Sequence, residues 1–232
     1  NPFVSTFKIG SGDITWLDYL EFISKKNKPI ILATGASTLR EVKLATNKIL
    51  KKNKKLVLMQ CNTNYTASNN NLNYVNLNVL KIYKKLFPKI ILGLSDHTFG
   101  HTAVLGAVTL GARVIEKHFT DDNKRTGPDH KFSMNPITWK NMVNATRELE
   151  LTLGSSLKKI EKNENQTVIL QRRSIRLKSS IDKNQVIRKD NLVFLRPCPK
   201  DAYLLENYKN IIGKKAKRKI KSGDYIKKSD FR

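Results

Sequence analysis

Short apolar runs alternate with amphipathic stretches over about the first 150 residues of the chain. Five runs predict strands that each end in polar residues or glycine: 4–9, 29–32, 56–60, 90–94 and 112–119. The stretches between them space apolar residues as one face of a helix does, at 14–25, 38–52, 73–87 and 102–111. A further helix begins at Pro136. This alternation predicts an α/β fold with a parallel sheet.

Five successive β-α units fit two architectures, a partial TIM (β/α)8 barrel or an open, doubly wound sheet. No G-x-G-x-x-G follows the first predicted strand, which counts against a dinucleotide-binding sheet. A complete barrel takes about 250 residues, so about three β-α units would be missing before residue 1. The pattern therefore favours the last five units of a barrel in residues 1–153.

The remaining sequence predicts a linker and a small second domain. Residues 154–167 are polar and charged, and residues 168–232 form short apolar runs between turn signals. Residues 181–192 and 220–231 resemble each other at an offset of 39 positions, which predicts a quasi-twofold, mostly β module. Because this region has few carboxylates and no histidine, we expect it to bind or position rather than catalyse.

The chain is strongly basic, with 44 Lys and Arg against 19 Asp and Glu, a net charge of +25. Such a balance can indicate nucleic acid, an anionic membrane or an acidic substrate. Here the lysines are dispersed and often stand beside asparagine, and no RNA-binding aromatic motif or zinc finger is present. We therefore expect biased codon usage, compatible with steering of an anionic substrate, and no nucleic-acid partner.

Cysteine content and hydropathy suggest a location. Cys61 and Cys198 form no disulfide framework or metal-ligand pair, so a reducing, cytoplasmic compartment is expected. No apolar run approaches 18 residues, so no membrane partner is expected.

Two histidines close the fourth and fifth predicted strands. His97 follows Ser95 and Asp96, and His118 lies on the same strand face as Glu116. Neighbouring strands lie about 5 Å apart, so both imidazoles could reach one metal ion. The alternative is that each is an isolated, hydrogen-bonded histidine; their equivalent positions favour a shared metal site.

Lysine, glycine and hydroxyl groups at the same ends of the strands predict phosphate binding. Lys8 precedes a tight Gly-Ser-Gly turn that contains Ser11, and freed backbone amides beside a lysine suit phosphate or carboxylate. The turn alone is also a common structural feature. Further hydroxyls follow neighbouring strands, at Thr34, Thr63, Tyr65 and Ser95. With a metal site, they point to metal-assisted chemistry on a phosphorylated substrate.

Six motifs carry a family resemblance. They are K-I-G-S-G-D (8–13), P-I-I-L-A-T-G (29–35), G-L-S-D-H-T (93–98), I-E-K-H-F-T (115–120), G-P-D-H (127–130) and S-M-N-P (133–136). In this order they resemble the sialic acid (N-acetylneuraminate) synthase family. The L-R-P at 195–197 and the last twelve residues are similar to that family's antifreeze-like (SAF) domain.

The resemblance implies a transferase that joins phosphoenolpyruvate to the open-chain aldehyde of N-acetylmannosamine or a related sugar. It implies a divalent metal, Mn²⁺ or Mg²⁺, on His97 and His118. It assigns phosphoenolpyruvate contacts to Lys8, Ser11 and Ser95, with Tyr65 nearby.

The resemblance also implies roles further from the metal. Asp13 would handle a proton and Asp129 would contact the acceptor sugar. Arg196 would reach the neighbouring subunit's site, which implies a domain-swapped homodimer. Three departures affect the acceptor more than the reaction: Asp13 where many relatives have Glu, Ala33 where some have Ser, and Thr63 where some have Asn.

The family's first barrel strands have no counterpart here, so we expect the chain alone to be inactive. The alternative is a non-catalytic fragment of the same family that binds a sugar or polyanion.

Overall fold

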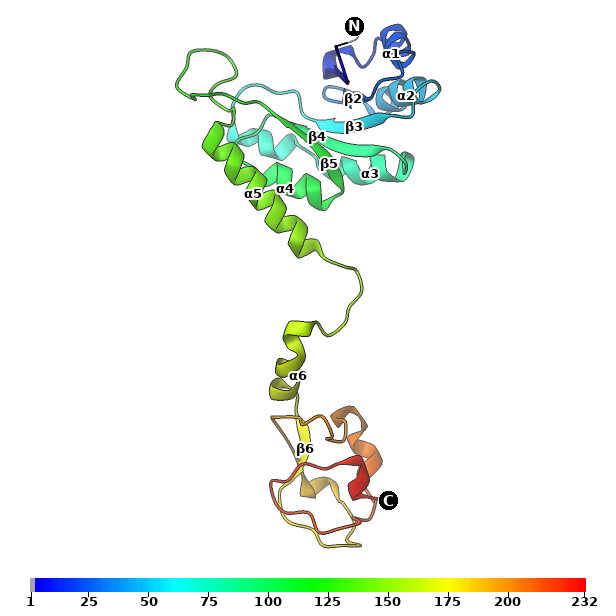
Figure 1. Cartoon of the computed structure of the whole chain (residues 1–232), viewed down its shortest axis with the longest axis vertical. Coiled ribbons are helices and arrows are strands. Elements are labelled where there is room, and N and C mark those ends of the chain that lie inside the picture. Colours follow the sequence, from blue (N-terminus) through cyan, green and yellow to red (C-terminus); the bar gives the residue numbers. More distant parts are fainter. Residues whose placement is uncertain (1–2) are drawn as a thin grey trace. The chain divides into compact units, whose positions relative to one another are not determined.

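The computed structural model describes residues 3–232 and divides the chain into two compact units, Asn1–Gly154 and Ser155–Arg232 (Figure 1). Each unit has its own buried apolar cluster.

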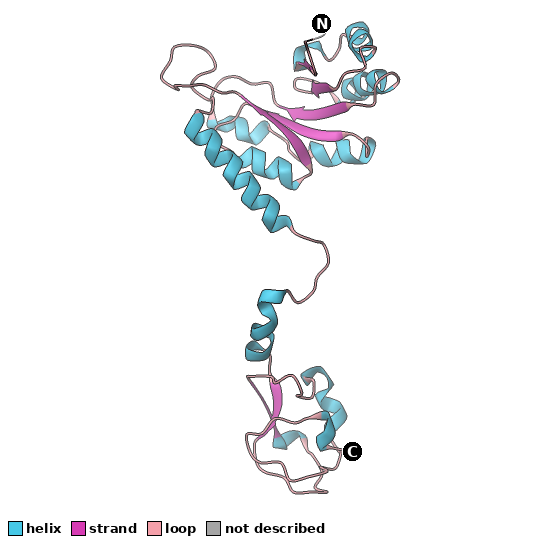
Figure 2. Cartoon of the chain, viewed as in Figure 1, coloured by secondary structure: helices cyan, strands magenta, loops and turns pink. Residues whose placement is uncertain are grey.

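Strands and helices alternate through the first unit (Figure 2). The strands are β1 (Phe7–Ile9), β2 (Ile30–Ala33), β3 (Leu56–Cys61), β4 (Ile91–Asp96) and β5 (Ala112–Lys117). The helices are α1 (Leu17–Ser24), α2 (Leu39–Leu50), α3 (Val79–Leu86), α4 (Thr102–Thr109) and α5 (Pro136–Leu153). All strand pairs are parallel, in the order β1-β2-β3-β4-β5.

The strand order decides between the two architectures. A doubly wound sheet reverses direction at a switch point, whereas here each strand pairs with the next one along the chain. Because β-α-β crossovers are right-handed, winding in one direction places every connecting helix on one face of the sheet. The partial (β/α)8 barrel is therefore confirmed, and the doubly wound alternative is wrong.

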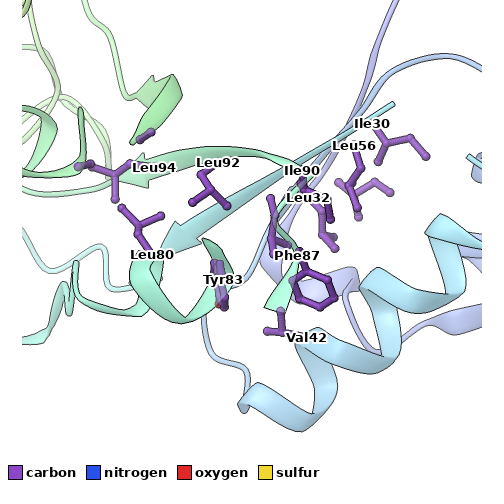
Figure 3. Close-up of a cluster of buried hydrophobic side chains, with 14 of the residues drawn as sticks. Ile30, Leu32, Val42, Leu56, Leu80, Tyr83, Phe87, Ile90, Leu92 and Leu94 are labelled. Carbon is purple, nitrogen blue, oxygen red and sulfur yellow. The ribbon is translucent and has the colours of Figure 1, made fainter. Parts of the chain in front are cut away.

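The core of the first unit lies between the sheet and these helices (Figure 3). Alternate residues of the strands point into it, and Leu32, Leu58 and Leu94 are fully buried. The helices contribute Val42, Leu80 and Tyr83. The residues that alternate with these along each strand point to the other face of the sheet, away from the helices.

Several predicted boundaries shift. The helix predicted over 73–87 is instead a 3-10 helix, Asn69–Tyr74, followed by α3. Asn76 separates them with φ +50°, a left-handed conformation that asparagine tolerates and a continuous helix does not. Thr38 and Glu41 form a capping box at the start of α2.

The second unit contains α6 (Asn165–Gln171) and one antiparallel pair, β6 (Ser174–Leu177) with β7 (Leu192–Leu195). Helix α6 begins inside the predicted linker, because the polar residues 165–167 form the first turn ahead of an apolar run. Isolated bridges and 3-10 helices make up most of the rest.

The internal repeat is visible as symmetric pairing. Ile181 and Ile220, which are equivalent positions, exchange two backbone hydrogen bonds of 3.0 Å. Both side chains are buried in the unit's apolar cluster, as are the equivalent pair Ile187 and Ile226. Two 3-10 helices, Lys189–Asn191 and Lys228–Asp230, also correspond at this offset.

Across residues 3–232, no helix has both the length and the apolar character that a membrane span requires.

Candidate functional site

Polar side chains gather at the carboxyl ends of the strands, on the face away from the helices. The register aligns Cys61 of β3 with Ser95 of β4, and Ser95 with Glu116 of β5. Two positions beyond Ser95 and Glu116 stand His97 and His118. Strand periodicity therefore places both histidines on one face, as predicted.

The two imidazoles lie side by side, with ring centroids 5.1 Å apart. The ring of Tyr65 stands edge-on to both, 4.4 Å from His97 and 5.5 Å from His118. The ring of Phe132, which follows β5 in the sequence, has its centroid 4.9 Å from that of His118. Two aromatic rings thus flank the histidine pair and limit how the imidazoles can turn.

A backbone carbonyl fixes the tautomer of His97. Its Nδ1 lies 2.9 Å from the Asn62 carbonyl oxygen, which can only accept a hydrogen bond. Nδ1 therefore carries the proton, and the lone pair of neutral His97 is on Nε2. Such a partner commonly orients a histidine that binds a metal.

A carboxylate faces the same atom of His118. Its Nδ1 lies 3.3 Å from Asp129 Oδ2. The carboxylate favours a proton on Nδ1, so Nε2 is again the nitrogen with the lone pair. The side chain of His118 is 26% exposed, and that of Asp129 is 49% exposed.

The donor set fits a divalent ion that takes its other ligands from water or substrate. Two neutral imidazole nitrogens suit first-row transition metals. Within residues 3–232, no group of three or more His, Cys, Asp or Glu side chains is arranged to hold a metal ion. If a divalent ion binds here, His97 and His118 would be its ligands from the described residues, and its other coordination positions would be left for water or substrate.

Burial and neighbouring charges shift the pKa values at this site. Burial lowers the pKa of His97, but its contacts with Cys61, the Asn62 carbonyl and Asp96 outweigh burial, and the pKa is raised. Burial and the charge of His97 lower the pKa of His118 more than Asp129 and Glu116 raise it. His118 therefore stays neutral, the form that binds metals, to lower pH than an ordinary histidine.

The thiol of Cys61 lies beside this pair. Its Sγ is 3.9 Å from His97 Nδ1 and 3.5 Å from Thr63 Oγ1. Burial raises the pKa of Cys61, but hydrogen bonds with His97, Thr63 and Ser11 outweigh burial and lower it. Sequence reasoning did not include Cys61, although its place at the end of β3, level with Ser95, could have identified it.

Lys8 and Ser11 line the same face from β1. Lys8 Nζ pairs with Glu116 Oε2 at 3.1 Å, and Ser11 Oγ accepts a hydrogen bond from Gly35 N at 2.8 Å. A Cβ at Gly35 would lie 1.6 Å from Thr63 Oγ1. Only glycine therefore allows the three strand ends to approach this closely.

Three predicted residues lie apart from this group. Thr34 Oγ1 donates to the Met59 carbonyl and lies 2.9 Å from Tyr83 Oη, so its hydroxyl is turned towards α3. Asp13 is exposed in a 3-10 helix after the Gly-Ser-Gly turn. Arg196 is exposed in the second unit, where its Nε donates to the Gln171 carbonyl.

A buried ion pair joins β4 and β5 on the face of the sheet opposite the histidines. Lys117 Nζ lies 2.6 Å from Asp96 Oδ2, and both side chains are 1% exposed. Asp96 Oδ1 accepts hydrogen bonds from the backbone and hydroxyl of Thr98. Asp96 and Lys117 alternate along β4 and β5 with Ser95, His97 and Glu116, and so point to the opposite face of the sheet. The ion pair therefore holds together the two strands that carry the histidines.

The sequence matches the NeuB family over residues 1–158 and the SAF domain over residues 172–232. It is 38% identical to the N,N'-diacetyllegionaminic acid synthase of Campylobacter jejuni, over 95% of this chain and 65% of that protein. It is 32% identical to the human N-acetylneuraminate-9-phosphate synthase, over 96% of this chain and 61% of that protein.

A solved structure agrees with these matches. The spore coat polysaccharide biosynthesis protein SpsE of Bacillus subtilis superimposes with a TM-score of 0.60 and 30% identity, over 98% of this chain and 67% of that one. The chain spans less than two thirds of the length of the two curated relatives above.

Proposed function

The chain belongs to the NeuB family and carries a SAF domain, and on this basis we propose that it is part of a nonulosonate synthase. The proposed reaction condenses phosphoenolpyruvate with N-acetylmannosamine or a related acylated sugar, giving a nine-carbon acid and phosphate. The synthase names of the relatives and the polar strand ends of this chain support the proposal.

The proposed chemistry forms a C–C bond, adds water and breaks a C–O bond. Enolpyruvate C3 attacks the aldehyde carbon, and the aldehyde oxygen takes a proton to become a hydroxyl. Water adds at C2, and the C2–O bond to the phosphoryl group breaks to release phosphate. The proposed transferase therefore needs groups that bind phosphate and carboxylate, orient the aldehyde and move protons.

His97 and His118 would hold Mn²⁺ or Mg²⁺ through Nε2. When bound, the ion would polarise the aldehyde oxygen as a Lewis acid. Tyr65 would keep both imidazoles in place, since its ring contacts each of them edge-on.

Lys8, Ser11 and Ser95 would bind phosphoenolpyruvate, with Thr63 beside them. The ammonium of Lys8 would supply the positive charge, because it lies on the same face as the histidines and is only 34% exposed. An anion would compete with Glu116 for that ammonium. Thr34 is the weakest member of the predicted set, because Met59 and Tyr83 already engage its hydroxyl.

The remaining roles stay as proposals from the family resemblance. Asp13 would transfer a proton near the turn, and Asp129 would contact the acceptor sugar. Arg196 would act on the site of a second subunit in a domain-swapped homodimer. Sedimentation of the chain at several concentrations would test the dimer, and a strictly monomeric species would exclude it.

A cytoplasmic location is proposed from the two cysteines, both of which are free. Fractionation of cells that carry the gene would test this, and recovery outside the cytoplasm would contradict it.

One observation carries the proposed function: two histidines with ring centroids 5.1 Å apart, each with a polar partner at Nδ1, on the strand face that holds Lys8. The test measures phosphate release from phosphoenolpyruvate by the longest natural polypeptide that contains this chain. Mn²⁺ is supplied with N-acetylmannosamine, its 6-phosphate or a 6-deoxy diacetamido analogue.

The expected result is release that depends on one acceptor and is lost in His97→Ala. His101→Ala is the matched control, since His101 lies outside the histidine pair, at the start of α4. No release with any acceptor from a folded, metal-binding protein would reject the synthase and favour the sugar- or polyanion-binding alternative.

A further inference from the structure

The loop after β5 folds back onto the residues that precede it. Met134 N donates to the His118 carbonyl at 2.9 Å, and Thr120 N donates to the Met134 carbonyl at 2.8 Å. These two bonds form a short parallel bridge, so both ends of the loop are attached beside His118. Asp129 lies between these attached ends.

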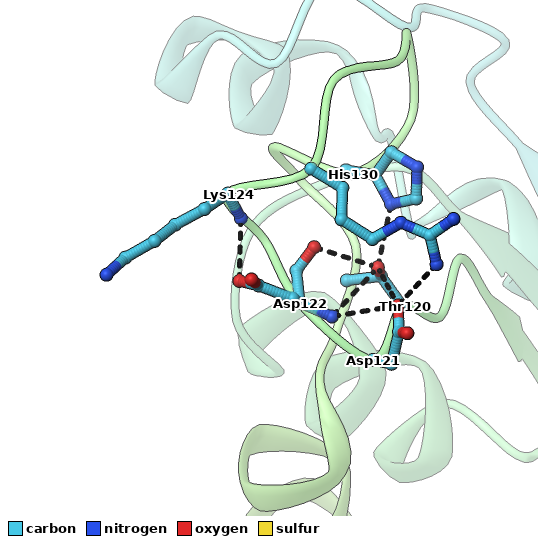
Figure 4. A network of polar contacts seen from close by, with 6 residues as sticks. Thr120, Asp121, Asp122, Lys124 and His130 are labelled. Carbon is cyan, nitrogen blue, oxygen red and sulfur yellow. Dashed lines mark hydrogen bonds and ion pairs between the residues drawn. The ribbon is translucent and has the colours of Figure 1, made fainter.

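A polar network fixes the interior of this loop, and Figure 4 shows the part of it around Thr120 and His130. Thr120 Oγ1 lies 2.7 Å from His130 Nδ1. Asn123 Nδ2 donates to the carbonyls of His130 and Ser133, each at 2.8 Å. Asn123 Oδ1 in turn accepts a hydrogen bond from Asn135 Nδ2 at 2.9 Å. One asparagine side chain therefore joins three points of the loop.

The backbone at Asp129 is held directly. Ser133 Oγ donates to the Asp129 carbonyl at 2.6 Å, and Ser133 N donates to the same oxygen at 3.2 Å. This turn limits the positions available to the Asp129 carboxylate, although that side chain is half exposed.

The two histidines thus differ in what holds their Nδ1 atoms. His97 uses a backbone carbonyl at the end of β3, whereas His118 faces a carboxylate from a loop. A carboxylate is the stronger acceptor and makes the opposite ring nitrogen a more basic ligand. It also makes the orientation of His118 depend on the fold of that loop.

We propose that Asp129 is a positioning residue for His118: its Oδ2 accepts the Nδ1 proton, and the hydrogen bonds of Asn123 and Ser133 fix the loop backbone that carries this carboxylate. His118 then carries its lone pair on Nε2, as His97 does, with the two ring centroids 5.1 Å apart. A carboxylate has two oxygens, so this role is compatible with an acceptor-sugar contact through Oδ1. The metal-binding part rests on the proposed function, whereas the tautomer does not.

The test compares Asp129→Ala and Asp129→Asn with the unchanged chain. Long-range ¹⁵N NMR of the imidazoles reads the tautomer without metal, and titration with Mn²⁺ alone reads the affinity. We expect His118 to be protonated on Nδ1 in the unchanged chain and to become a tautomer mixture in Asp129→Ala. Mn²⁺ affinity should fall roughly 10- to 100-fold. Asp129→Asn, which keeps an acceptor oxygen, should fall between them.

Asp18→Ala is the control, because it removes an exposed carboxylate of the first unit that lies on α1 and not in this loop. In this control variant, the His118 tautomer and the Mn²⁺ affinity should be the same as in the unchanged chain. Thermal unfolding should confirm that every variant is folded. The proposal is overturned if His118 is protonated on Nε2, or if Asp129→Ala keeps tautomer and affinity within twofold.

The outcomes separate this proposal from the synthase. Acceptor-dependent phosphate release with an unaffected Asp129→Ala tautomer would reject only the positioning role. An unchanged chain without measurable Mn²⁺ affinity would reject the metal part of both, and phosphate release would then decide the synthase by itself.

Discussion

Lys8 and Glu116 lie on the first and last strands of the sheet, yet Lys8 Nζ is 3.1 Å from Glu116 Oε2. Four strand spacings in a flat sheet separate β1 from β5 by about 19 Å, which is too far for these two side chains to span. The sheet must therefore curve towards its inner face, as a barrel wall does. The Lys8–Glu116 ion pair connects the two edge strands across the concave face of the sheet.

The first prediction concerns the Lys8 ammonium. Lys8→Met should weaken binding of phosphoenolpyruvate by roughly 10- to 100-fold, the range expected when a charged hydrogen bond is lost. Lys8→Arg keeps the charge and should lose less. Calorimetric titration measures both affinities, and a Lys8→Met affinity within twofold of the unchanged chain would contradict the assignment.

The second prediction concerns the buried pair behind the site. Lys117→Met leaves Asp96 buried without its counter-ion. The free energy of unfolding of the first unit should therefore fall by about 3–5 kcal/mol. Arg147→Met removes an exposed ion pair with Glu150 and should change stability by about 0.5 kcal/mol or less. Urea unfolding measures both. If both substitutions lowered the free energy of unfolding equally, burial of the ion pair would not determine the loss of stability.

The third prediction concerns the close approach at Gly35. Gly35→Ala places a methyl group where Thr63 Oγ1 lies, so it should cost about 1–3 kcal/mol of stability through overpacking. Adding Thr63→Ala removes the nearest atom and should recover part of the loss. Chemical unfolding of both single variants and the double variant gives the coupling; strictly additive losses would rule out this contact as the cause.

The fourth prediction is a pH dependence at the surface. Hydrogen bonds from Lys48 and then Lys25 lower the pKa of Glu21 to about 2, from an ordinary value of 4.5. A lowered folded-state pKa stabilises the fold above pH 4.5, and this contribution is lost as the pH falls towards 2. Glu21→Gln should therefore be less stable than the unchanged chain near pH 7 and equally stable near pH 2. Thermal unfolding across this range measures the difference, and a constant gap would contradict the prediction.

Sequence periodicity predicted much of this site and could have predicted more. His97 and His118 follow from strand ends, since neighbouring parallel strands end at one edge. The same two-residue period places Thr34 on the face of the buried Leu32, towards the helices, so counting along β2 would have separated it from Ser11.

Other features depend on tertiary structure. Phe132 reaches His118 only because a loop returns to the strand it left, and no local pattern encodes that return. The apolar run 90–94 predicts a strand from its residues alone, but the curvature that joins Lys8 to Glu116 is a property of the whole sheet.

The hydrogen-bonded pair Ile181 and Ile220 has a consequence for how the two halves of the second unit associate. Equivalent positions that bond to each other lie on a local two-fold axis, as they would at the interface of a symmetric dimer. Two separate half-length peptides could form the same contacts, but only at concentrations that favour association. Because both halves belong to one polypeptide, the encounter is intramolecular, at an effective concentration that reaches millimolar for short connections. The unit therefore has the geometry of a symmetric dimer whose two halves are covalently joined.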